Sequence, residues 1–197
     1  GAFLVLHLAG NLLIFAGAEH FNAYSEALVS NPLIYVAELV LLLLFVAHLV
    51  TGIAVYRRNR AARPHDYAVK RRAGHTSHKS LASTSMILSG LFLLVFVPLH
   101  LLTFKFGKYY ETATSPPMRD LQRLVIEVFS SPAYVAFYAV AMVLVGFHLW
   151  HGVSSGFQSA GLYSRKGLRL FGQIFAIVIA GGFLAIPILV YLLGGRL

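Results

Sequence analysis

The sequence predicts an all-α integral membrane bundle of five transmembrane helices, and three observations indicate this fold class. Of the 197 residues, 58% are hydrophobic and 12% are charged, whereas an ordinary soluble domain contains about 25% charged residues. The mean hydropathy is +0.74. The chain also contains five apolar stretches of roughly 20 residues, the length that a helix needs to cross a bilayer. Because backbone groups in lipid must form hydrogen bonds within their own segment, we expect these stretches to be helices.

Each of the five helices is expected to begin and end with its apolar stretch. The predicted spans are 1–18, 33–56, 81–106, 133–157 and 168–193. The second and fourth spans follow Asn-Pro and Ser-Pro pairs, which are typical of a helix N-terminus. The first begins without an initiator Met and without the basic residues of a signal peptide, so we expect a helix truncated at its N-terminus. Together the spans are predicted to form a single domain, residues 1–197.

The distribution of basic residues predicts the orientation of the helices. The connection 57–80 contains eight Lys and Arg and one acidic residue, and the connection 158–169 contains three and none. The connections 19–32 and 107–132 together contain three basic and five acidic residues. Because basic loops stay on the cytoplasmic side, we expect a cytoplasmic N-terminus and an external C-terminus. The net charge of +9 lies between apolar spans, and this placement does not favour nucleic acid as a partner.

Four histidines lie within apolar sequence, one in each of the first four predicted spans: His7, His48, His100 and His148. His48 lies eight residues before Tyr56, which places it about 12 Å from the cytoplasmic end of its helix at 1.5 Å per residue. The predicted helix directions place His148 at a similar height and the other two toward the outer half. The sequence therefore predicts an inner pair, His48 with His148, and an outer pair, His7 with His100.

Imidazoles on separate helices are typical of bis-histidine haem ligation. Two such side chains can bind one iron from both sides while the porphyrin fills the bundle core. Gly52 and Gly152 follow His48 and His148 by four residues, so they share the helix face of the ligand and leave room for a macrocycle. With both axial positions filled, electron transfer is favoured over oxygen binding. The absence of cysteine excludes iron–sulfur ligation and thiol chemistry in this chain.

Two alternatives to this interpretation remain. A haem-free membrane anchor or transporter would use the histidines as polar relays or helix-packing groups. The apolar stretches contain little to support proton-relay pairs, since Glu38 is the only deep carboxylate. A cytochrome b of the bc type commonly carries two ligands on one helix, about four turns apart. Here each helix offers one deep histidine, which argues against that second alternative.

Several stretches, spread over essentially the whole chain, agree in order and spacing with one known family. They are "HLAGNLLIFAG" (7–17), "FNAYSEAL" (21–28), "HLVTG" (48–52), "ARP" (62–64) followed by Tyr67, "SGLFLLVFVPLHLLTF" (89–104), "FSSPAYVAFY" (129–138), "HLWHGVSSGFQSAG" (148–161) and "IPI" (186–188). These stretches resemble the di-haem cytochrome b membrane-anchor subunit of succinate:quinone oxidoreductases, the succinate dehydrogenase and fumarate reductase (complex II) family.

The resemblance implies two b-type haems stacked across the bilayer. His48 and His148 would bind the proximal haem iron, and His7 and His100 the distal one. His151 lies one turn beyond His148, and we interpret it as a partner of a haem propionate or of the backbone, or as a packed polar group. The glycines Gly52 and Gly152 would then line the proximal haem.

The resemblance also implies partners. A flavoprotein subunit would carry out the succinate or fumarate chemistry, which is not expected in this chain. An iron–sulfur subunit would dock on the basic cytoplasmic face, and electrons would pass through the haems to or from a quinone, either menaquinone or ubiquinone. Such a subunit lies in the inner (cytoplasmic) membrane among lipids, within the respiratory chain and the tricarboxylic acid cycle. The resemblance permits a higher oligomer of the complex, but the sequence does not determine the oligomeric state.

The quinone is expected in a pocket against a haem, lined by a few polar groups. The candidates near the outer surface are Glu19, His20, Glu26 and Glu38, and those near the inner surface are Ser80, Ser83 and His78. No catalytic residue is assigned beyond these candidates. In some menaquinol-oxidising members of the family, a glutamate two residues before the fourth-helix ligand conducts protons. Gly146 stands at that position, so we do not expect a proton path there.

Overall fold

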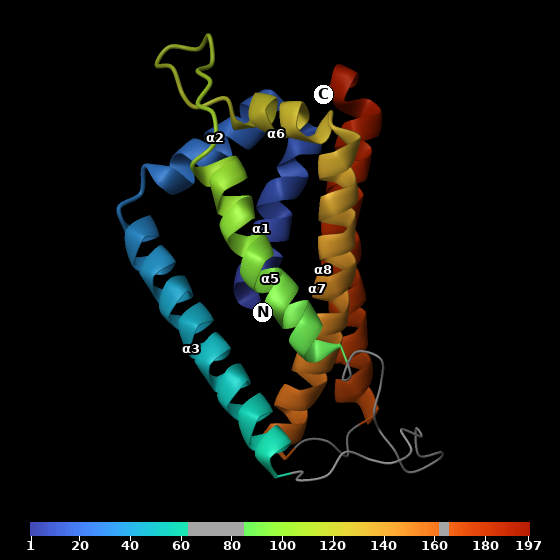
Figure 1. The fold of residues 1–197 in the computed structure, drawn as a ribbon. Helices are drawn as coiled ribbons and strands as arrows, with labels where there is room; N and C mark the ends of the chain where they lie inside the picture. The colour runs from blue at the N-terminus through green and yellow to red at the C-terminus, as the bar shows by residue number, and fades with distance from the viewer. Residues whose placement is uncertain (63–84, 162–165) are drawn as a thin grey trace. The chain divides into compact units, whose positions relative to one another are not determined.

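The computed structural model describes residues 1–62, 85–161 and 166–197, and Figure 1 shows that these residues are predominantly helical. Within these ranges every regular element is a helix, apart from an isolated bridge between Glu111 and Arg119. The predicted all-α fold class is therefore confirmed for the described residues.

Four helices in the described part of the chain are long and apolar enough to cross a membrane. They are Leu33–Ala61, Met86–Lys105, Pro132–Phe157 and Leu170–Arg196. These correspond to the second to fifth predicted spans. The apolar helical stretch that corresponds to the first, Ala2–Ala16, is shorter. By length and composition the structure supports four of the five spans, and the five-span topology with its orientation stays a prediction.

The chain divides into two compact units, which are described separately: Gly1–Glu26 with Ser80–Leu197, and Ala27–Lys79. The second unit contains α3 (Leu33–Ala61), a continuous helix of 29 residues. The Asn31 side chain accepts a hydrogen bond from the Leu33 backbone N–H at 3.0 Å, so this Asn-Pro pair does mark the start of the helix. Arg58 and Arg60 occupy its last turn, where positive charge stabilises the helix dipole. The prediction of a single domain stays a prediction.

Four apolar helices of the described residues pack together in the first unit (Figure 1): α7 contacts α5 and α8, and α1, from the other end of the chain, also contacts α8. The helices are α1 (Ala2–Leu12) continued by η1 (Leu13–Ala16), α5 (Met86–His100) continued by the π-helical turn η2 (Leu101–Lys105), α7 (Pro132–Ser159), and α8 (Lys166–Leu193) continued by η3 (Gly194–Arg196). Small residues permit the closest approaches. A Cβ added at Gly182 would lie 2.7 Å from Leu8, and one at Gly146 would lie 3.1 Å from Ala180. These glycines therefore serve helix crossings, as is common in membrane proteins.

Two short helices, α2 (Ala18–Val29) and α6 (Leu121–Phe129), begin in the connections that follow η1 and η2. Both segments were expected to be connections between spans, so these two helices were not predicted from the sequence. Asn22 and Gln122 are 1% and 4% exposed, and they pair through the Gln122 backbone N–H and the Asn22 side-chain oxygen at 3.0 Å. Asn22 also donates to Asp120 at 2.9 Å, and Asp120 caps α6 by accepting from the Arg123 N–H at 3.1 Å. The two helices are therefore joined by buried, satisfied polar groups.

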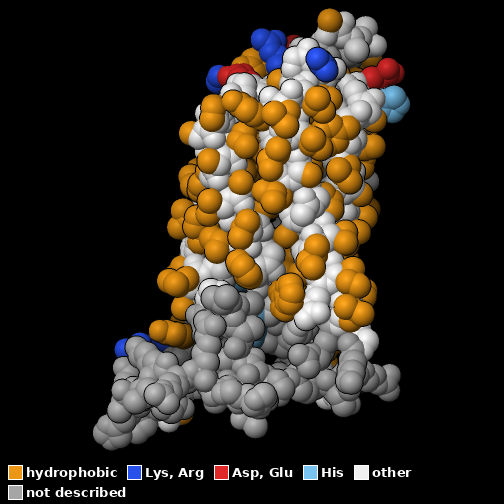
Figure 2. Space-filling model, turned by 90° about the vertical axis from the view of Figure 1, so that its right-hand side faces the viewer, with side chains coloured by type: hydrophobic (Ala, Val, Ile, Leu, Met, Phe, Trp, Pro, Cys, Tyr) orange, Lys and Arg blue, Asp and Glu red, His pale blue; other side chains and the backbone are white. Residues whose placement is uncertain are grey.

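The face formed by α7 and α8 is apolar along its length in Figure 2, and the charged side chains visible there lie toward the ends. Val140 and Val143 of α7 and Ile174, Ile177 and Val178 of α8 are each about half exposed. A contiguous apolar surface of this size is typical of a protein that contacts lipid.

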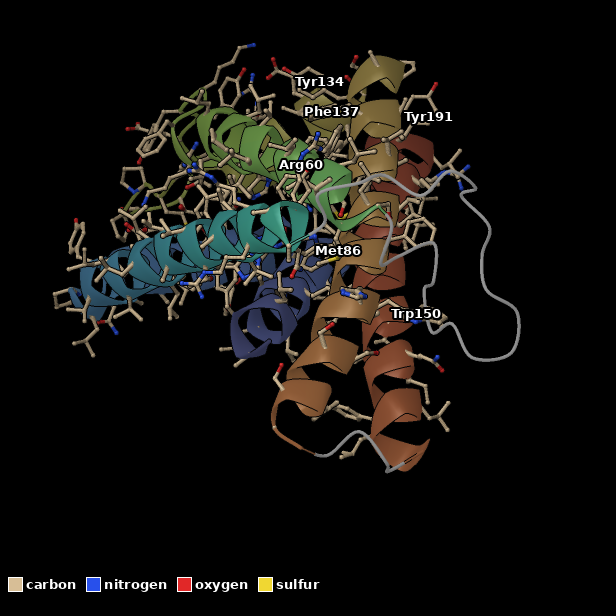
Figure 3. The ribbon with its side chains drawn as sticks, turned by 60° about the horizontal axis from the view of Figure 1, so that its bottom comes forward. Arg60, Met86, Tyr134, Phe137, Trp150 and Tyr191 are labelled. Carbon is tan, nitrogen blue, oxygen red and sulfur yellow. The ribbon has the colours of Figure 1, made fainter. Side chains whose placement is uncertain are left out.

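Tyrosines mark one end of the α7–α8 pair. Figure 3 labels Tyr134 in the first turn of α7 and Tyr191 in the last turn of α8, with Trp150 farther along α7. Tyr134 and Tyr191 are 44% and 47% exposed. Aromatic side chains with polar tips are enriched where a transmembrane helix meets the headgroup layer, so these positions suit a membrane boundary.

Candidate functional site

His7 and His100 meet in the first unit, where α1 and the end of α5 bring their rings together. The two ring centroids are 5.8 Å apart, and the planes are inclined by 88°. Because an imidazole nitrogen binds a first-row transition metal at about 2 Å, two imidazoles on opposite sides of one ion have centroids roughly 6 Å apart. The observed separation of 5.8 Å is compatible with a two-histidine site, and it is also the distance of ordinary phenylalanine pairs in the same core. Among the described residues no group of three or more His, Cys, Asp or Glu side chains could hold a metal ion.

Aromatic rings surround both imidazoles. The ring of Phe3 stacks on His7 at 5.2 Å, and Phe183 lies 5.4 Å from the same ring. The rings around His100 lie at 5.4–6.1 Å and belong to Phe96, Phe104 and Tyr138. Flat apolar walls of this kind exclude water and suit a planar macrocycle, although they pack an empty core equally well.

The Nδ1 atom of His100 lies 3.3 Å from the Tyr138 hydroxyl. Tyr138 is 6% exposed, and a buried tyrosine hydroxyl requires a partner. A metal-binding histidine usually forms a hydrogen bond with the ring nitrogen that does not bind the metal. Tyr138 therefore orients His100 with Nε2 directed away from the hydroxyl. Tyr138 was not predicted as a site residue from the sequence, although it lies in one of the stretches that resemble the family.

His7 is held by Asn11, one turn along α1. The Asn11 amide nitrogen donates to the His7 carbonyl oxygen at 2.7 Å and lies 3.3 Å from Nδ1 of the His7 ring. If the Asn11 side-chain amide were rotated by 180°, its oxygen would contact the His7 carbonyl oxygen without a hydrogen between them. The amide nitrogen of Asn11 is therefore the atom that faces both the carbonyl and the ring. Nδ1 then accepts, and the proton lies on Nε2. Iron binding through Nε2 would require Asn11 to turn its amide away. The contact between His7 and Asn11 was not predicted from the sequence, although the two residues are four positions apart.

A polar contact between α5 and α7 holds His148. Its Nδ1 lies 3.2 Å from the Ser89 hydroxyl oxygen. A Cβ added at Gly90 would lie 3.7 Å from Cε1 of the same ring, and one added at Gly152 would meet no described atom within 4 Å. The glycine after Ser89 thus lies beside the ring, and Gly152 leaves its own face of α7 open.

His48 and Gly52 lie on α3, in the second unit. Next to them, the Thr51 hydroxyl donates to the backbone carbonyls of Ala47 at 2.7 Å and His48 at 3.1 Å. This satisfies the hydroxyl within its own helix. The pairing of His48 with His148 stays a prediction.

The chain is similar to a succinate dehydrogenase subunit. The succinate dehydrogenase cytochrome b558 subunit of Bacillus subtilis (strain 168) is 26% identical over 159 residues, which cover 79% of this chain and 70% of that protein. No protein-family model matches the chain. No solved structure matches it.

The remaining predicted site residue of α7, His151, pairs within its own helix. Its Nε2 lies 3.1 Å from the Ser155 hydroxyl, and its side chain is half-buried. This contact agrees with a packed polar group, one of the three roles expected for His151, and leaves the other two as predictions.

The quinone-site candidates of the outer side belong to two helices, α2 and α3. Glu19 and His20 are exposed on α2, and Glu26 is half-buried on the same helix. Within the described residues no hydrogen bond joins them to His7 or His100. Glu38 lies on α3, in the second unit. The inner candidates Ser80, Ser83 and His78 lie outside the described residues.

The loop after η2 is fixed by charge. Arg119 donates to the carbonyl oxygens of Phe104 at 2.8 Å and Lys105 at 3.2 Å, at the end of η2. Lys108 forms an ion pair with Glu127 of α6. The hydrogen bond between them raises the pKa of Lys108 and lowers the pKa of Glu127. The segment that follows His100 is therefore held by two sets of polar contacts. One is formed by Arg119 with the end of η2, and the other by the exposed Lys108–Glu127 ion pair.

Proposed function

We propose that this chain is the cytochrome b membrane-anchor subunit of a succinate:quinone oxidoreductase, and that it transfers electrons between an iron–sulfur subunit and membrane quinone. One observation carries the proposal: His7 and His100, from two apolar helices, lie with ring centroids 5.8 Å apart in a chain that is similar to a cytochrome b558 subunit.

In this proposal His7 and His100 bind the distal haem b, and His48 and His148 bind the proximal one. The helix α5 supports two sites at different depths, because Ser89 contacts His148 near its beginning and His100 meets His7 at its end. Eleven residues separate Ser89 from His100, or about 16 Å along the helix axis. When bound, haem b would supply a one-electron carrier without an open coordination position. The residues of this chain orient the two ligand pairs and exclude water.

The proposed setting is the inner (cytoplasmic) membrane, with five spans, a cytoplasmic N-terminus and an external C-terminus. The basic connections 57–80 and 158–169 would then face the cytoplasm, where they would attract an acidic surface of the iron–sulfur subunit. A flavoprotein subunit would oxidise succinate or reduce fumarate. Menaquinone or ubiquinone would be the membrane substrate, with Glu19, His20, Glu26 and Glu38 as candidate contacts on the outer side.

The test is a reduced-minus-oxidised optical spectrum with haem quantitation on the purified complex. We expect two b-type haems per chain, and the loss of one in each of His7→Ala and His148→Ala. His151→Ala, one turn from His148, is the matched control and should retain both haems. A wild-type chain without haem would favour the haem-free anchor or transporter. Loss of haem in His151→Ala but not in His148→Ala would contradict the ligand assignment.

A further inference from the structure

Ser89 is a fully buried polar residue of α5, with 0% of its surface exposed. Its hydroxyl oxygen lies 3.0 Å from the Met86 carbonyl oxygen, one turn earlier in the helix, and 3.2 Å from Nδ1 of His148 on α7. A serine hydroxyl has one hydrogen to donate and lone pairs with which to accept. The directions of these two hydrogen bonds therefore depend on each other.

The Met86 contact determines the direction of both bonds. A carbonyl oxygen can only accept, so the hydroxyl hydrogen of Ser89 points at Met86. The Ser89 oxygen then faces His148 with a lone pair, and the ring must donate from Nδ1–H. The opposite assignment would leave the Ser89 and Met86 oxygens in contact without a hydrogen between them, in a place that water does not reach.

We infer that Ser89 is a positioning residue for His148: its hydroxyl accepts the Nδ1–H, fixes the tautomer, and thereby leaves the lone pair on Nε2 for iron. This inference rests on the proposed function, and it adds a residue to which neither the sequence analysis nor the similarity to the b558 subunit assigns a role. A hydrogen-bond acceptor behind a ligand histidine fixes the ring orientation and makes the imidazole more basic. Gly90, the next residue, also faces the ring, since a Cβ added there would lie 3.7 Å from Cε1 of His148, an ordinary van der Waals contact.

The same chemistry distinguishes His148 from His151. In His151 the ring nitrogen near a hydroxyl is Nε2, which lies 3.1 Å from Ser155. That hydroxyl belongs to the same helix and occupies the nitrogen that projects farthest from the backbone. His148 instead uses the nitrogen nearer its backbone for the bond and receives its partner from another helix. The hydrogen bonds therefore favour His148 as the ligand.

The test compares Ser89→Val with Ser89→Thr in the intact complex, because these side chains have the same shape and differ in the hydroxyl. We expect Ser89→Val, like Ser89→Ala, to weaken haem retention at the inner site by about 10- to 100-fold. The midpoint potential of that haem should rise, since a less basic ligand stabilises ferric iron less. Ser89→Thr should keep both properties of the wild type. Ser155→Ala, which removes the hydroxyl beside His151, should change neither.

Each other outcome overturns the inference. If Ser89→Val and Ser89→Thr behave alike, the role of Ser89 is packing. If Ser89→Ala keeps the wild-type potential, or if Ser155→Ala shifts it, Ser89 does not position the ligand. These results would be obtained with a wild type that contains two haems and would leave the proposed function intact. A wild type without haem would instead overturn the proposed function, and this inference with it.

Discussion

At the beginning of α5, Ser89 contacts His148 through one buried hydroxyl at 3.2 Å, whereas at the end of the same helix His100 lies among aromatic rings. In the first environment the ring forms a hydrogen bond with a fully buried hydroxyl of another helix. In the second, the polar contacts of His100 and His7 have nearly the same length, 3.3 Å, but aromatic rings also pack against both imidazoles. One helix thus supports two imidazole sites in physically different ways.

The backbone of α5 explains part of this difference. Pro98 lies inside the helix, two residues before His100, and the π-helical turn η2 follows directly. Proline removes a helical hydrogen bond, and π-helical turns often occur at functional sites because they redirect side chains. The end of α5 therefore depends on surrounding contacts, such as those of Arg119 with the carbonyls of Phe104 and Lys105. At Ser89 the helix is regular and needs no such support.

The largest expected effect on haem content is at His100, the end of α5 where aromatic rings pack around the imidazole. In the proposed cytochrome, His100→Ala should remove the outer haem, because the ring would supply one of its two axial ligands. It should leave the inner haem and its potential unchanged, since Ser89 and His148 lie eleven residues away along α5. Haem quantitation and redox titration of the purified complex measure both. Loss of both haems would show that the two ends of α5 are not independent.

The next largest effect is expected on removing the hydroxyl of Tyr138, which contacts His100. Tyr138→Phe removes the hydrogen bond to His100 but keeps the ring, which also contacts Phe96, Phe104 and Phe129. Because packing still holds His100, we expect outer haem retention to fall by about 10-fold, the lower limit for the loss of a ligand's hydrogen-bond partner. The effect should be smaller than that of Ser89→Ala on the inner haem. An equal or larger effect would contradict the comparison between the two ends.

The sequence predicted the apolar helices and the four deep histidines, because length, hydropathy and position along the chain determine them. It did not predict α2 and α6, because helices of 12 and 9 residues are too short to cross a bilayer and lie in segments that were expected to be connections. Ser89 and Tyr138 could not be recognised either, because their partners His148 and His100 lie 59 and 38 residues away. Their residue types do not reveal which helix face meets a histidine. Asn11 differs, since its i, i+4 spacing from His7 is visible in the sequence.

A smaller effect of opposite sign is expected at Asn11. In the present structure its amide directs a donor toward Nδ1 of His7, which opposes the tautomer required for iron binding through Nε2. Asn11→Ala removes this donor, so outer haem retention should equal or exceed that of the wild type. The measurement is haem retention during dilution or detergent washing, compared with Ser89→Ala at the inner site. A decrease would show that Asn11 assists the ligand, as Ser89 does.

The smallest effect, a change in Tm, is expected at the exposed ion pair between Lys108 and Glu127. Glu127 of α6 pairs with Lys108, and the hydrogen bond lowers the pKa of Glu127 below its usual value. A carboxylate whose pKa is lower in the folded state stabilises the protein above the pKa of the unfolded chain, and this contribution is lost as the pH falls through the lowered pKa. Glu127→Gln should therefore lower the Tm slightly at pH 7 and leave it equal to that of the wild type in acid. High salt should reduce the difference, since exposed ion pairs are weak and screened. If Glu127→Gln released the outer haem at pH 7, this surface contact, and not the aromatic packing around His100, would hold the outer site together.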